Sequence, residues 1–463
     1  MLAPVRVLIK DILSSMSTEL ERGGGTSTPG PANPDSPLDE RDIFASVVRD
    51  LLALSSTSPT PTTSSSPTTS NPSSSLRDTL SIRLRALLTT ARQRVEHIPF
   101  HLVSGATLRG YTDASVLLAV LFLIDGRGGW KDIVQILDRA IIVAGAVGSH
   151  RLEWVQALIA ALQPPAHPHQ DLNGSSCPNP SPPSPPASQP LFAPNPIPTP
   201  STPPPLTTAP FILRSYLASG THHPPWPALS RWQSGEYLVS KTGRGRIVPV
   251  ECGRAYDDSG WTQRLVDWES FLRRSGWNLG PKGREDGAPQ YLAQTSLFRQ
   301  FRGLETGMAL PDYIWAETPD TYKPPPEVLV NAWIGPGGHE VVSPAHTDPY
   351  YNCYAQVLGY KRVWLAPPDA SPHMYAYTGQ AATDASLAEE YMGNTSRVPL
   401  LRPALDKTFR AQQSTFPAFF KHVYPDAMEA VLGPGDMLVM PPGWWHAMRG
   451  EGEGPCWSVS FWF

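Results

Sequence analysis

His346, Asp348 and His446 are the residues of this sequence whose types and spacing point most directly to chemistry. The first two form a His-x-Asp pair in SPAHTDPYYN, and the third stands alone much later, in GDMLVMPPGWWHAM. Two histidines and one carboxylate bind one face of a metal ion and leave its other positions open, as non-haem Fe(II) oxygenases require. We therefore predict that these three side chains hold iron. The alternative is that they are ordinary surface or core residues, because His-x-Asp pairs also occur by chance.

The elements around these residues must bring them together. Side chains two apart on a strand share a face, so one strand lets His346 and Asp348 reach the same ion. The apolar run MLVMPP before Gly443 predicts a strand that ends in a turn and delivers His446. Lys361 lies in another apolar run, YKRVWLAPP, where an ammonium group needs a negative partner. A dicarboxylate cosubstrate at the iron would supply that partner.

Several motifs in the C-terminal half resemble one known family. RIVPVECGRAY, QYLAQTSLF, VNAWIGPGGHEVVSPAHTDPYYNCYAQVLGYKRVWLAPP, NTSRV, GDMLVMPPGWWHAM and SVSFWF occur in that order between residues 210 and 463. Together they resemble the JmjC-domain 2-oxoglutarate oxygenases. The resemblance implies a double-stranded β-helix (the cupin-type jelly roll), Fe(II), 2-oxoglutarate as cosubstrate and dioxygen.

The resemblance also implies roles for further residues, which match the family's motifs one by one. Lys361 and Tyr291 would hold the far carboxylate of 2-oxoglutarate, and Asn352 and Ser343 would line the cosubstrate pocket. Tyr291 as a core aromatic residue, and Asn352 and Ser343 as turn caps, are the simpler alternatives.

Two matching positions concern the substrate. Glu251 and Trp333 would receive its basic side chain, because a carboxylate attracts a cation and an aromatic ring stacks on a planar guanidinium. That combination favours arginine over a methylated lysine. The alternative for Glu251 is a structural pair with an arginine of this chain.

Composition limits the class of protein. The net charge is −4 and the pI is about 6.3, so no general basic field exists to hold nucleic acid. Cys177, Cys252, Cys353 and Cys456 lie far apart, without zinc-finger spacing, and indicate free thiols in a reducing compartment. The most apolar run, VLLAVLFLI at 116–124, is far below the ~20 residues that span a bilayer, so we expect no membrane segment. We expect a monomer, located in the nucleus with the cytoplasm as a second compartment.

The chain divides into an α-helical half and a β-rich half, so we predict an α+β fold. Residues 1–37 form a partly disordered N-terminal segment, and 38–163 an α-helical domain with a disordered Ser/Thr/Pro insert at 55–75. Residues 164–210 form a Pro-rich linker, and 211–463 the catalytic domain. In that domain we expect short strands, helical inserts such as DSGWTQRLVDWESFLRR packed outside them, and a long excursion at 369–432. The helical domain holds no cluster of catalytic residue types, so we expect a structural or docking role for it.

We therefore expect a dioxygenase that hydroxylates a basic side chain, preferably arginyl, of a protein or peptide. Chromatin-associated proteins are candidate substrates. Demethylation of a histone methyl-lysine is the alternative within the same chemistry. A catalytically inactive binding or scaffold protein is the alternative of another class, and the complete triad argues against it. A zinc or manganese cupin with non-oxidative chemistry would leave Lys361 without a function.

Overall fold

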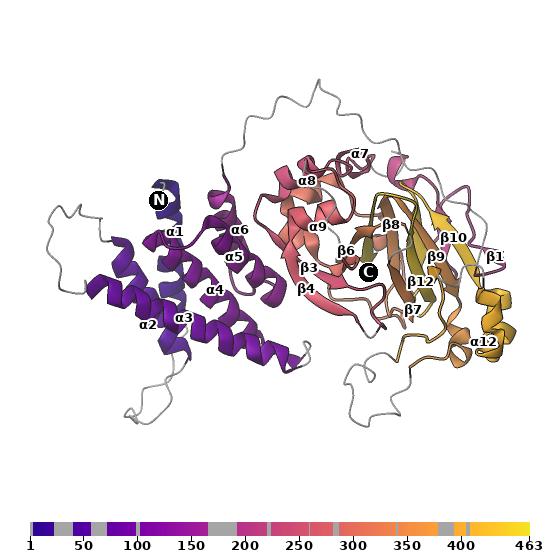
Figure 1. The fold of residues 1–463 in the computed structure, drawn as a ribbon, viewed down its shortest axis with the longest axis horizontal. Helices are drawn as coiled ribbons and strands as arrows, with labels where there is room; N and C mark the ends of the chain where they lie inside the picture. Colours follow the sequence, from indigo (N-terminus) through magenta and orange to yellow (C-terminus); the bar gives the residue numbers. More distant parts are fainter. Residues whose placement is uncertain are drawn as a thin grey trace, which may run out of the picture. The chain divides into compact units, whose positions relative to one another are not determined.

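The computed structural model describes residues 3–22, 40–56, 72–98, 102–164, 192–219, 224–258, 260–280, 287–338, 341–377, 393–403 and 408–463. The chain forms two compact units (Figure 1). Met1–Ala166 and Gly243–Ile247 make up the first, which we call the helical unit. His167–Thr242 and Val248–Phe463 make up the second, which we call the sheet unit.

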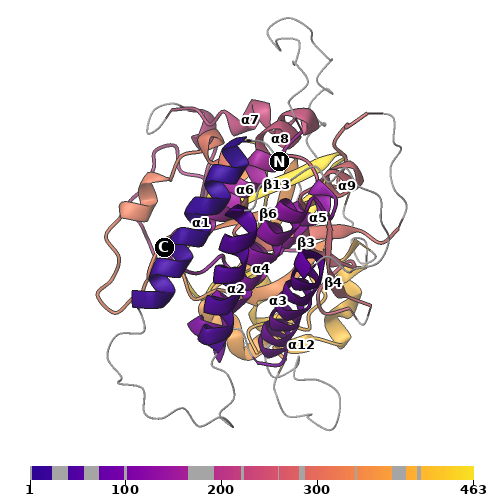
Figure 2. The same ribbon diagram turned by 90° about the vertical axis from the view of Figure 1, so that its left-hand side faces the viewer.

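The helical unit is built around one apolar helix. Its helices are α1 (Ala3–Arg22), α2 (Glu40–Ser56), α3 (Pro72–Glu96), α4 (Gly105–Asp125), α5 (Trp130–Ala144) and α6 (Arg151–Leu162). Ser104 caps α4 by accepting a hydrogen bond from the Thr107 N–H, and Gly126 ends it in the left-handed conformation. α4 packs against α2, α3, α5 and α6, and for this reason it is apolar on nearly every side (Figure 2).

Two sequence predictions about this unit are corrected. The segment 1–37 contains α1, whose Ile9, Ile12 and Leu13 are buried in the same core as α4, so helical structure begins well before residue 38. The apolar run at 116–124 belongs to α4, which has 21 residues and is long and apolar enough to cross a membrane by length and composition. Most of it is buried inside the helical unit. Most of the expected Ser/Thr/Pro insert, residues 57–71, lies outside the described residues.

A short segment from far along the chain completes the helical unit. Arg246 forms a bidentate ion pair with Asp138 of α5, with Nη2–Oδ1 at 2.6 Å and Nε–Oδ2 at 2.9 Å. Asp138 also accepts a hydrogen bond from the Ile247 N–H at 3.0 Å. Both charged side chains are almost fully buried, so each ion depends on the other for its solvation. In the same segment, the Arg244 N–H donates a hydrogen bond to the side-chain oxygen of Gln163 at 2.6 Å.

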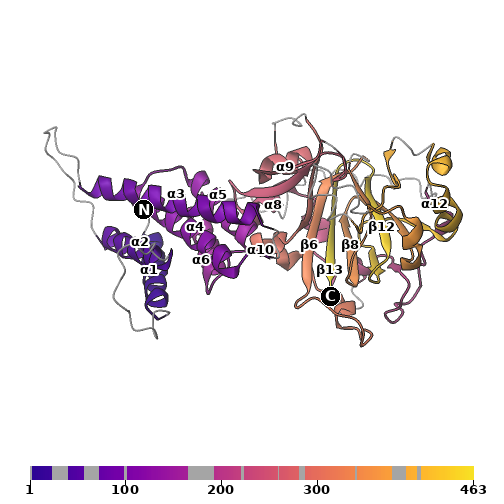
Figure 3. The same cartoon turned by 90° about the horizontal axis from the view of Figure 1, so that it is seen from below.

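The sheet unit contains two sheets. The first has five strands in the order β1-β10-β9-β12-β7, and the second has eight in the order β2-β11-β8-β13-β6-β5-β3-β4. Figure 3 shows β6, β13 and β8 side by side in the second sheet. The strands are β1 (Asn195–Pro196), β2 (Phe211–Leu213), β3 (Ile247–Cys252), β4 (Thr262–Asp267), β5 (Gln290–Thr295), β6 (Leu329–Pro336), β7 (Val342–Thr347), β8 (Asn352–Leu358), β9 (Tyr360–Ala366), β10 (Met428–Leu432), β11 (Met437–Met440), β12 (Trp445–Glu451) and β13 (Pro455–Trp462).

Alternation along the strands separates an interior face from an outer face. Tyr354 of β8, Leu365 of β9 and Met448 of β12 belong to one buried cluster that includes strands of both sheets, so this cluster lies between the sheets. The neighbours of Tyr354 in sequence, Cys353 and Ala355, pack instead with the tryptophans and helices outside the second sheet. The architecture is the predicted jelly roll.

The helices and short turns of this unit lie around the sheets. The helices are α7 (Ala228–Arg231), α8 (Gly235–Thr242), α9 (Trp268–Arg274), α10 (Leu297–Gln300) and α12 (Pro417–His422). The 3₁₀ turns are η2 (Tyr216–Ala218), η3 (Arg302–Gly307), η4 (Asp312–Trp315), η5 (Pro368–His373), η7 (Phe409–Ser414) and η8 (Tyr424–Asp426). The excursion at 369–432 is thus partly helical, as expected, and it ends in β10; residues 378–392 and 404–407 lie outside the described residues.

Two expectations about the sheet unit are wrong in part. Residues 192–210 were assigned to the linker, but β1 pairs with β10, and Phe192 and Ile197 are buried. The expected helix at 258–274 contains instead a strand, β4, followed by the shorter helix α9. Asp267 separates them because its Oδ1 accepts a hydrogen bond from the Ser270 N–H at 2.8 Å and so caps the helix. Cys252, Cys353 and Cys456 are free thiols, as predicted, and Cys177 lies outside the described residues.

Candidate metal centre

The three predicted metal ligands converge on one point. His346 on β7 and His446 on β12 stand directly opposite each other on antiparallel strands, and Asp348 follows the end of β7. One ligand atom from each side chain lies within 4.8 Å of the other two. The Nε2 of His446 is 3.4 Å from Asp348 Oδ2, and that of His346 is 4.0 Å from Asp348 Oδ1. This is the donor set of a two-His-one-carboxylate site.

His446 comes from a different strand than the sequence indicates. The run MLVMPP forms β11, which pairs with β8 and β2 in the second sheet. The chain then turns through Gly443 and re-enters the first sheet as β12, where Trp445 and Ala447 pack on the outside. Alternation therefore directs His446 between the sheets. The turn is held by a hydrogen bond from the Gly443 N–H to the Asp348 carbonyl at 2.8 Å.

Both histidine rings are oriented by backbone carbonyls. The Nδ1 of His346 lies 2.8 Å from the Pro344 carbonyl oxygen, and that of His446 lies 3.0 Å from the Trp444 carbonyl oxygen. A carbonyl only accepts, so each Nδ1 carries the proton and donates it. Each Nε2 then presents a lone pair toward the common point, which is the arrangement that fixes metal-binding imidazoles.

The electrostatics of the triad also suit a cation. Burial and the neighbouring His446 lower the pKa of His346 to about 4, so its ring is neutral at neutral pH. Burial raises the pKa of Asp348, but the hydrogen bond with His446 and the charges of both histidines outweigh burial and lower it below its usual value. The site therefore offers a neutral imidazole at His346 and an ionised carboxylate at Asp348, both suited to a cation.

Lys361 is a buried cation without a carboxylate partner in the described part of the chain. It is 3% exposed on β9, and its neighbours Arg362 and Trp364 turn away from it. Its Nζ donates a hydrogen bond to the Tyr291 hydroxyl at 3.0 Å and lies 5.1 Å from the centre of that ring. An ammonium has three donors, so capacity remains for an anion. Lys361 and Tyr291, the two residues predicted to hold the far carboxylate of 2-oxoglutarate, are thus in contact with each other.

Asn352 and Ser343 lie on strands next to the triad. Asn352 begins β8, is 3% exposed, and its Oδ1 is buried without a hydrogen-bond partner among the described residues. Ser343 on β7 stands opposite Met448 in the register that pairs His346 with His446. No turn-capping hydrogen bond of either side chain is found in the described ranges. The unsatisfied buried amide fits a polar cosubstrate in this space.

Glu251 faces the interior without an ion-pair partner. Val248 and Val250 of β3 pack in the outer cluster, so alternation turns Glu251 to the interior, where it stands opposite Tyr291 of β5. Within the described ranges no arginine or lysine forms an ion pair with it. Burial raises the pKa of Glu251, and the Trp261 indole N–H offsets only part of this effect.

Trp333 lies on β6, on the same side of its strand as the interior. Its neighbours Ala332 and Ile334 pack in the outer cluster, so Trp333 faces the interior, and its Nε1–H donates to the Ser460 hydroxyl at 2.9 Å. Its ring centre lies 6.5 Å from that of Tyr291. The Tyr291 ring thus lies beside both Trp333 and the Lys361 ammonium.

Tyr256 is a site residue that the sequence prediction missed. It follows β3, and its ring meets the His346 ring edge to face at 6.4 Å between centres. Its hydroxyl is 3.4 Å from the Thr395 hydroxyl, and the charges of Glu251 and Asp348 both act on its pKa, which burial raises above the usual value. Tyr256 thus packs against the metal ligand His346, and the Glu251 carboxylate is near enough to act on its pKa. The motif RIVPVECGRAY contains it, but a tyrosine in a turn carries no local signal of this position.

The class of protein follows from comparison of the sequence with known families. Residues 206–463 match the cupin-like domain family, and the chain belongs to that family. It is 36% identical over 238 residues to Jumonji C domain-containing protein 5 of Drosophila melanogaster, which is 51% of this chain and 52% of that protein.

Two further relatives carry a related name. The chain is 35% identical over 240 residues to lysine-specific demethylase 8 of Danio rerio (51% of this chain, 50% of the relative). It is 34% identical over 238 residues to lysine-specific demethylase JMJ30 of Arabidopsis thaliana (51% of this chain, 47% of the relative). The chain thus spans about half the length of these relatives. The predicted resemblance to JmjC proteins is confirmed.

Proposed function

We propose that the sheet unit is an Fe(II)- and 2-oxoglutarate-dependent oxygenase that hydroxylates an arginyl side chain of a protein. The observation that carries the proposal is the interior of the jelly roll. It holds the triad, the buried Lys361 ammonium and the Glu251 carboxylate, neither of which has an ion-pair partner among the described residues. Two opposite charges without such partners in one protein interior are costly unless ligands of complementary charge bind there.

The residues divide the work between metal, cosubstrate and substrate. His346, Asp348 and His446 would hold the iron. Lys361 and Tyr291 would bind the far carboxylate of 2-oxoglutarate by a charge-assisted hydrogen bond and a hydroxyl. When bound, these groups supply the oxidative chemistry: 2-oxoglutarate is split into succinate and carbon dioxide, one atom of dioxygen enters succinate, and the other enters a C–H bond of the substrate.

The remaining residues would position the substrate. Glu251 would accept hydrogen bonds from a guanidinium, and Trp333 would offer a face for stacking. Tyr256, which packs against His346, would form the wall along which the side chain approaches the metal. Its neutral phenol adds no charge, so the cation is attracted to Glu251 alone.

Demethylation of a methyl-lysine is the second candidate, because two of the relatives are named lysine-specific demethylases. A methylammonium would also be attracted by Glu251, but it offers fewer donors than a guanidinium, whose planar fork matches a carboxylate. The two reactions give different products from peptides: arginine hydroxylation adds the mass of one oxygen atom, whereas lysine demethylation removes one methylene unit.

The test uses the full chain, supplied with Fe(II), 2-oxoglutarate and oxygen, on arrays of arginine and methyl-lysine peptides read by mass spectrometry. Asp348→Ala should abolish all turnover of 2-oxoglutarate. Glu251→Gln should abolish peptide hydroxylation and leave the slow turnover of 2-oxoglutarate without peptide. Glu236→Gln, an exposed carboxylate on α8, serves as the matched control. Loss of methyl groups without oxygen gain on arginine would overturn the arginine assignment, and absence of 2-oxoglutarate turnover would overturn the oxygenase assignment.

A further inference from the structure

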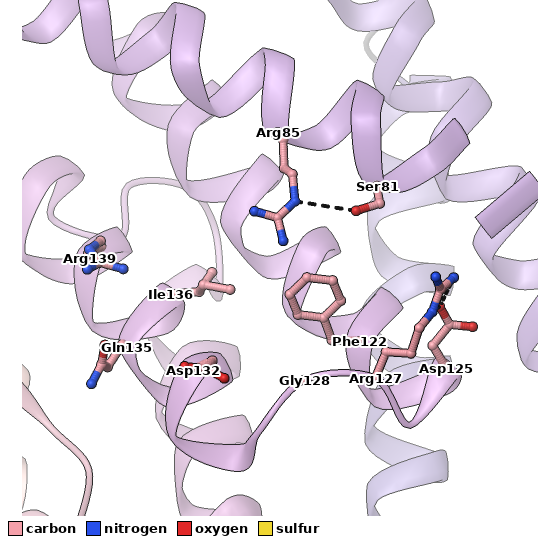
Figure 4. A pocket seen from close by; sticks show the side chains of 10 residues that line it. All are labelled: Ser81, Arg85, Phe122, Asp125, Arg127, Gly128, Asp132, Gln135, Ile136 and Arg139. Atoms are coloured by element: carbon pink, nitrogen blue, oxygen red, sulfur yellow. Dashed lines mark hydrogen bonds and ion pairs between the residues drawn. The ribbon is translucent and has the colours of Figure 1, made fainter. Parts of the chain in front are cut away.

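The helical unit carries a cleft that none of the proposed catalytic chemistry uses. It has a volume of about 530 Å³ and lies between α3, the end of α4 and α5 (Figure 4). This volume is in the range of ligand-binding clefts. Phe122 and Ile136 provide apolar surface, and Arg85, Arg127 and Arg139 provide positive charge.

Two of these arginines have no carboxylate partner within the described ranges. Arg85 donates a weak hydrogen bond to the Ser81 hydroxyl at 3.4 Å and lies 5.5 Å from the centre of the Phe122 ring (Figure 4). Arg139 forms no ion pair or hydrogen bond with a described residue. Both side chains are exposed, so both guanidinium groups are available to a ligand.

The acidic residues of the cleft are already engaged. Asp125 is paired with Arg77 at 2.9 Å and with Arg127 at 2.6 Å. The Asp132 carboxylate accepts a hydrogen bond from the Gly129 N–H at the start of α5. Asp125 is thus neutralised by two arginines, whereas Asp132 keeps its negative charge. The cleft therefore offers a ligand the two guanidinium groups of Arg85 and Arg139 beside one carboxylate.

We propose that this cleft binds a short acidic peptide segment of a partner protein, with one apolar side chain on Phe122 and Ile136 and carboxylates on Arg85 and Arg139. An arginine fork matches a carboxylate in geometry as well as in charge. A polyanion such as nucleic acid fits less well, because the Asp132 carboxylate lines the same cleft and would repel a continuous row of phosphates, whereas separate carboxylates can contact Arg85 and Arg139 alone. The polar side chain of Gln135, also in the lining, is suited to hydrogen bonds with an extended peptide backbone.

The experiment measures binding of fluorescein-labelled peptides to the full chain by anisotropy. The peptides carry one Leu, Phe or Trp flanked by Asp or Glu at varied spacing, and each has a matched version with Asn or Gln in place of the acids. We expect acidic peptides to bind more tightly than their neutral versions, and binding to weaken as salt is added. The variant R85E/R139E should weaken binding at least tenfold.

Arg83→Glu is the matched control, because Arg83 is exposed on the same helix but does not line the cleft. It changes the charge of α3 without changing the cleft, and it should alter binding by less than about twofold. Thermal melting confirms that each variant is folded, and Phe122→Ala tests the apolar contact separately. Equal binding of acidic and neutral peptides, or an equal loss with Arg83→Glu, would overturn the proposal.

Discussion

Replacing Lys361 by Met separates a cosubstrate-binding lysine from a structural one. Methionine has a similar volume and removes the charge. If 2-oxoglutarate is the missing counter-ion, its binding depends on a buried, charge-assisted contact. Removing one partner of such a contact costs about 3–5 kcal/mol, which corresponds to a loss of affinity of roughly two to three and a half orders of magnitude.

The stability of the unliganded protein should respond differently. Removing an unpaired buried ammonium relieves its desolvation, and exchange of buried charges for apolar groups is often neutral or stabilising by about 1–4 kcal/mol. The Tyr291 hydroxyl loses its donor, which costs about 1 kcal/mol. The two effects nearly cancel, so we expect the variant to melt at the same temperature as the parent or a few degrees higher.

Two measurements on the same samples decide the matter. Calorimetry with Fe(II) under nitrogen gives the 2-oxoglutarate affinity, and thermal unfolding without 2-oxoglutarate gives the stability. Lys421→Met, on the exposed face of α12, is the control and should change neither. A Lys361→Met variant that melts well below the parent but binds 2-oxoglutarate normally would refute the reasoning, because the ammonium would then be structural.

Three further outcomes are expected. The pKa of Glu251 is raised by burial, so the folded state binds this proton more readily than the unfolded state. The free energy of unfolding therefore falls as the pH rises above the ordinary pKa of 4.5. Glu251→Gln should melt at a higher temperature than the parent at pH 7, but not below pH 4. Tyr256→Phe should hydroxylate peptide at a rate within a few-fold of the parent, because the ring remains. Tyr256→Ala should raise the peptide KM and increase uncoupled 2-oxoglutarate turnover, measured as the ratio of succinate to hydroxylated peptide. Glu451→Gln should lower the free energy of unfolding by about 3–5 kcal/mol in urea titrations, because the carboxylate is 2% exposed and bridges Arg362 at 2.6 Å and Arg449 at 2.7 Å; an unchanged midpoint would contradict this.

The sequence predicts the metal ligands because their chemistry is local. A His-x-Asp pair needs only one strand end, and the lysine in YKRVWLAPP is conspicuous in an apolar run. The sequence does not predict that the chain leaves the second sheet after β11 and enters the first sheet as β12, which carries His446. This change of sheet depends on the turn between two short, buried strands.

Long-range pairing explains the other differences. Residues 195–196 read as linker because a two-residue strand has no periodicity, and only its pairing with β10 reveals it. Tyr256 becomes a site residue through contacts with His346 and Thr395, each from a distant part of the chain. Neither partner is visible in the local pattern around Tyr256.

The return of residues 243–247 to the helical unit affects any attempt to move one half of this protein into another context. The region that matches the cupin-like family, 206–463, contains these five residues, so a gene fragment cut to that region takes a piece of the helical unit with it. Arg246 would then lack Asp138, and a guanidinium that is almost fully buried in the whole chain would be left without its carboxylate. This residue directly precedes β3, the strand that carries the interior-facing Glu251. Fragments and chimeras should therefore retain α5 or replace Arg246 by an apolar residue. A minimal catalytic fragment with normal iron binding and poor substrate turnover would be the expected sign of an incomplete cut.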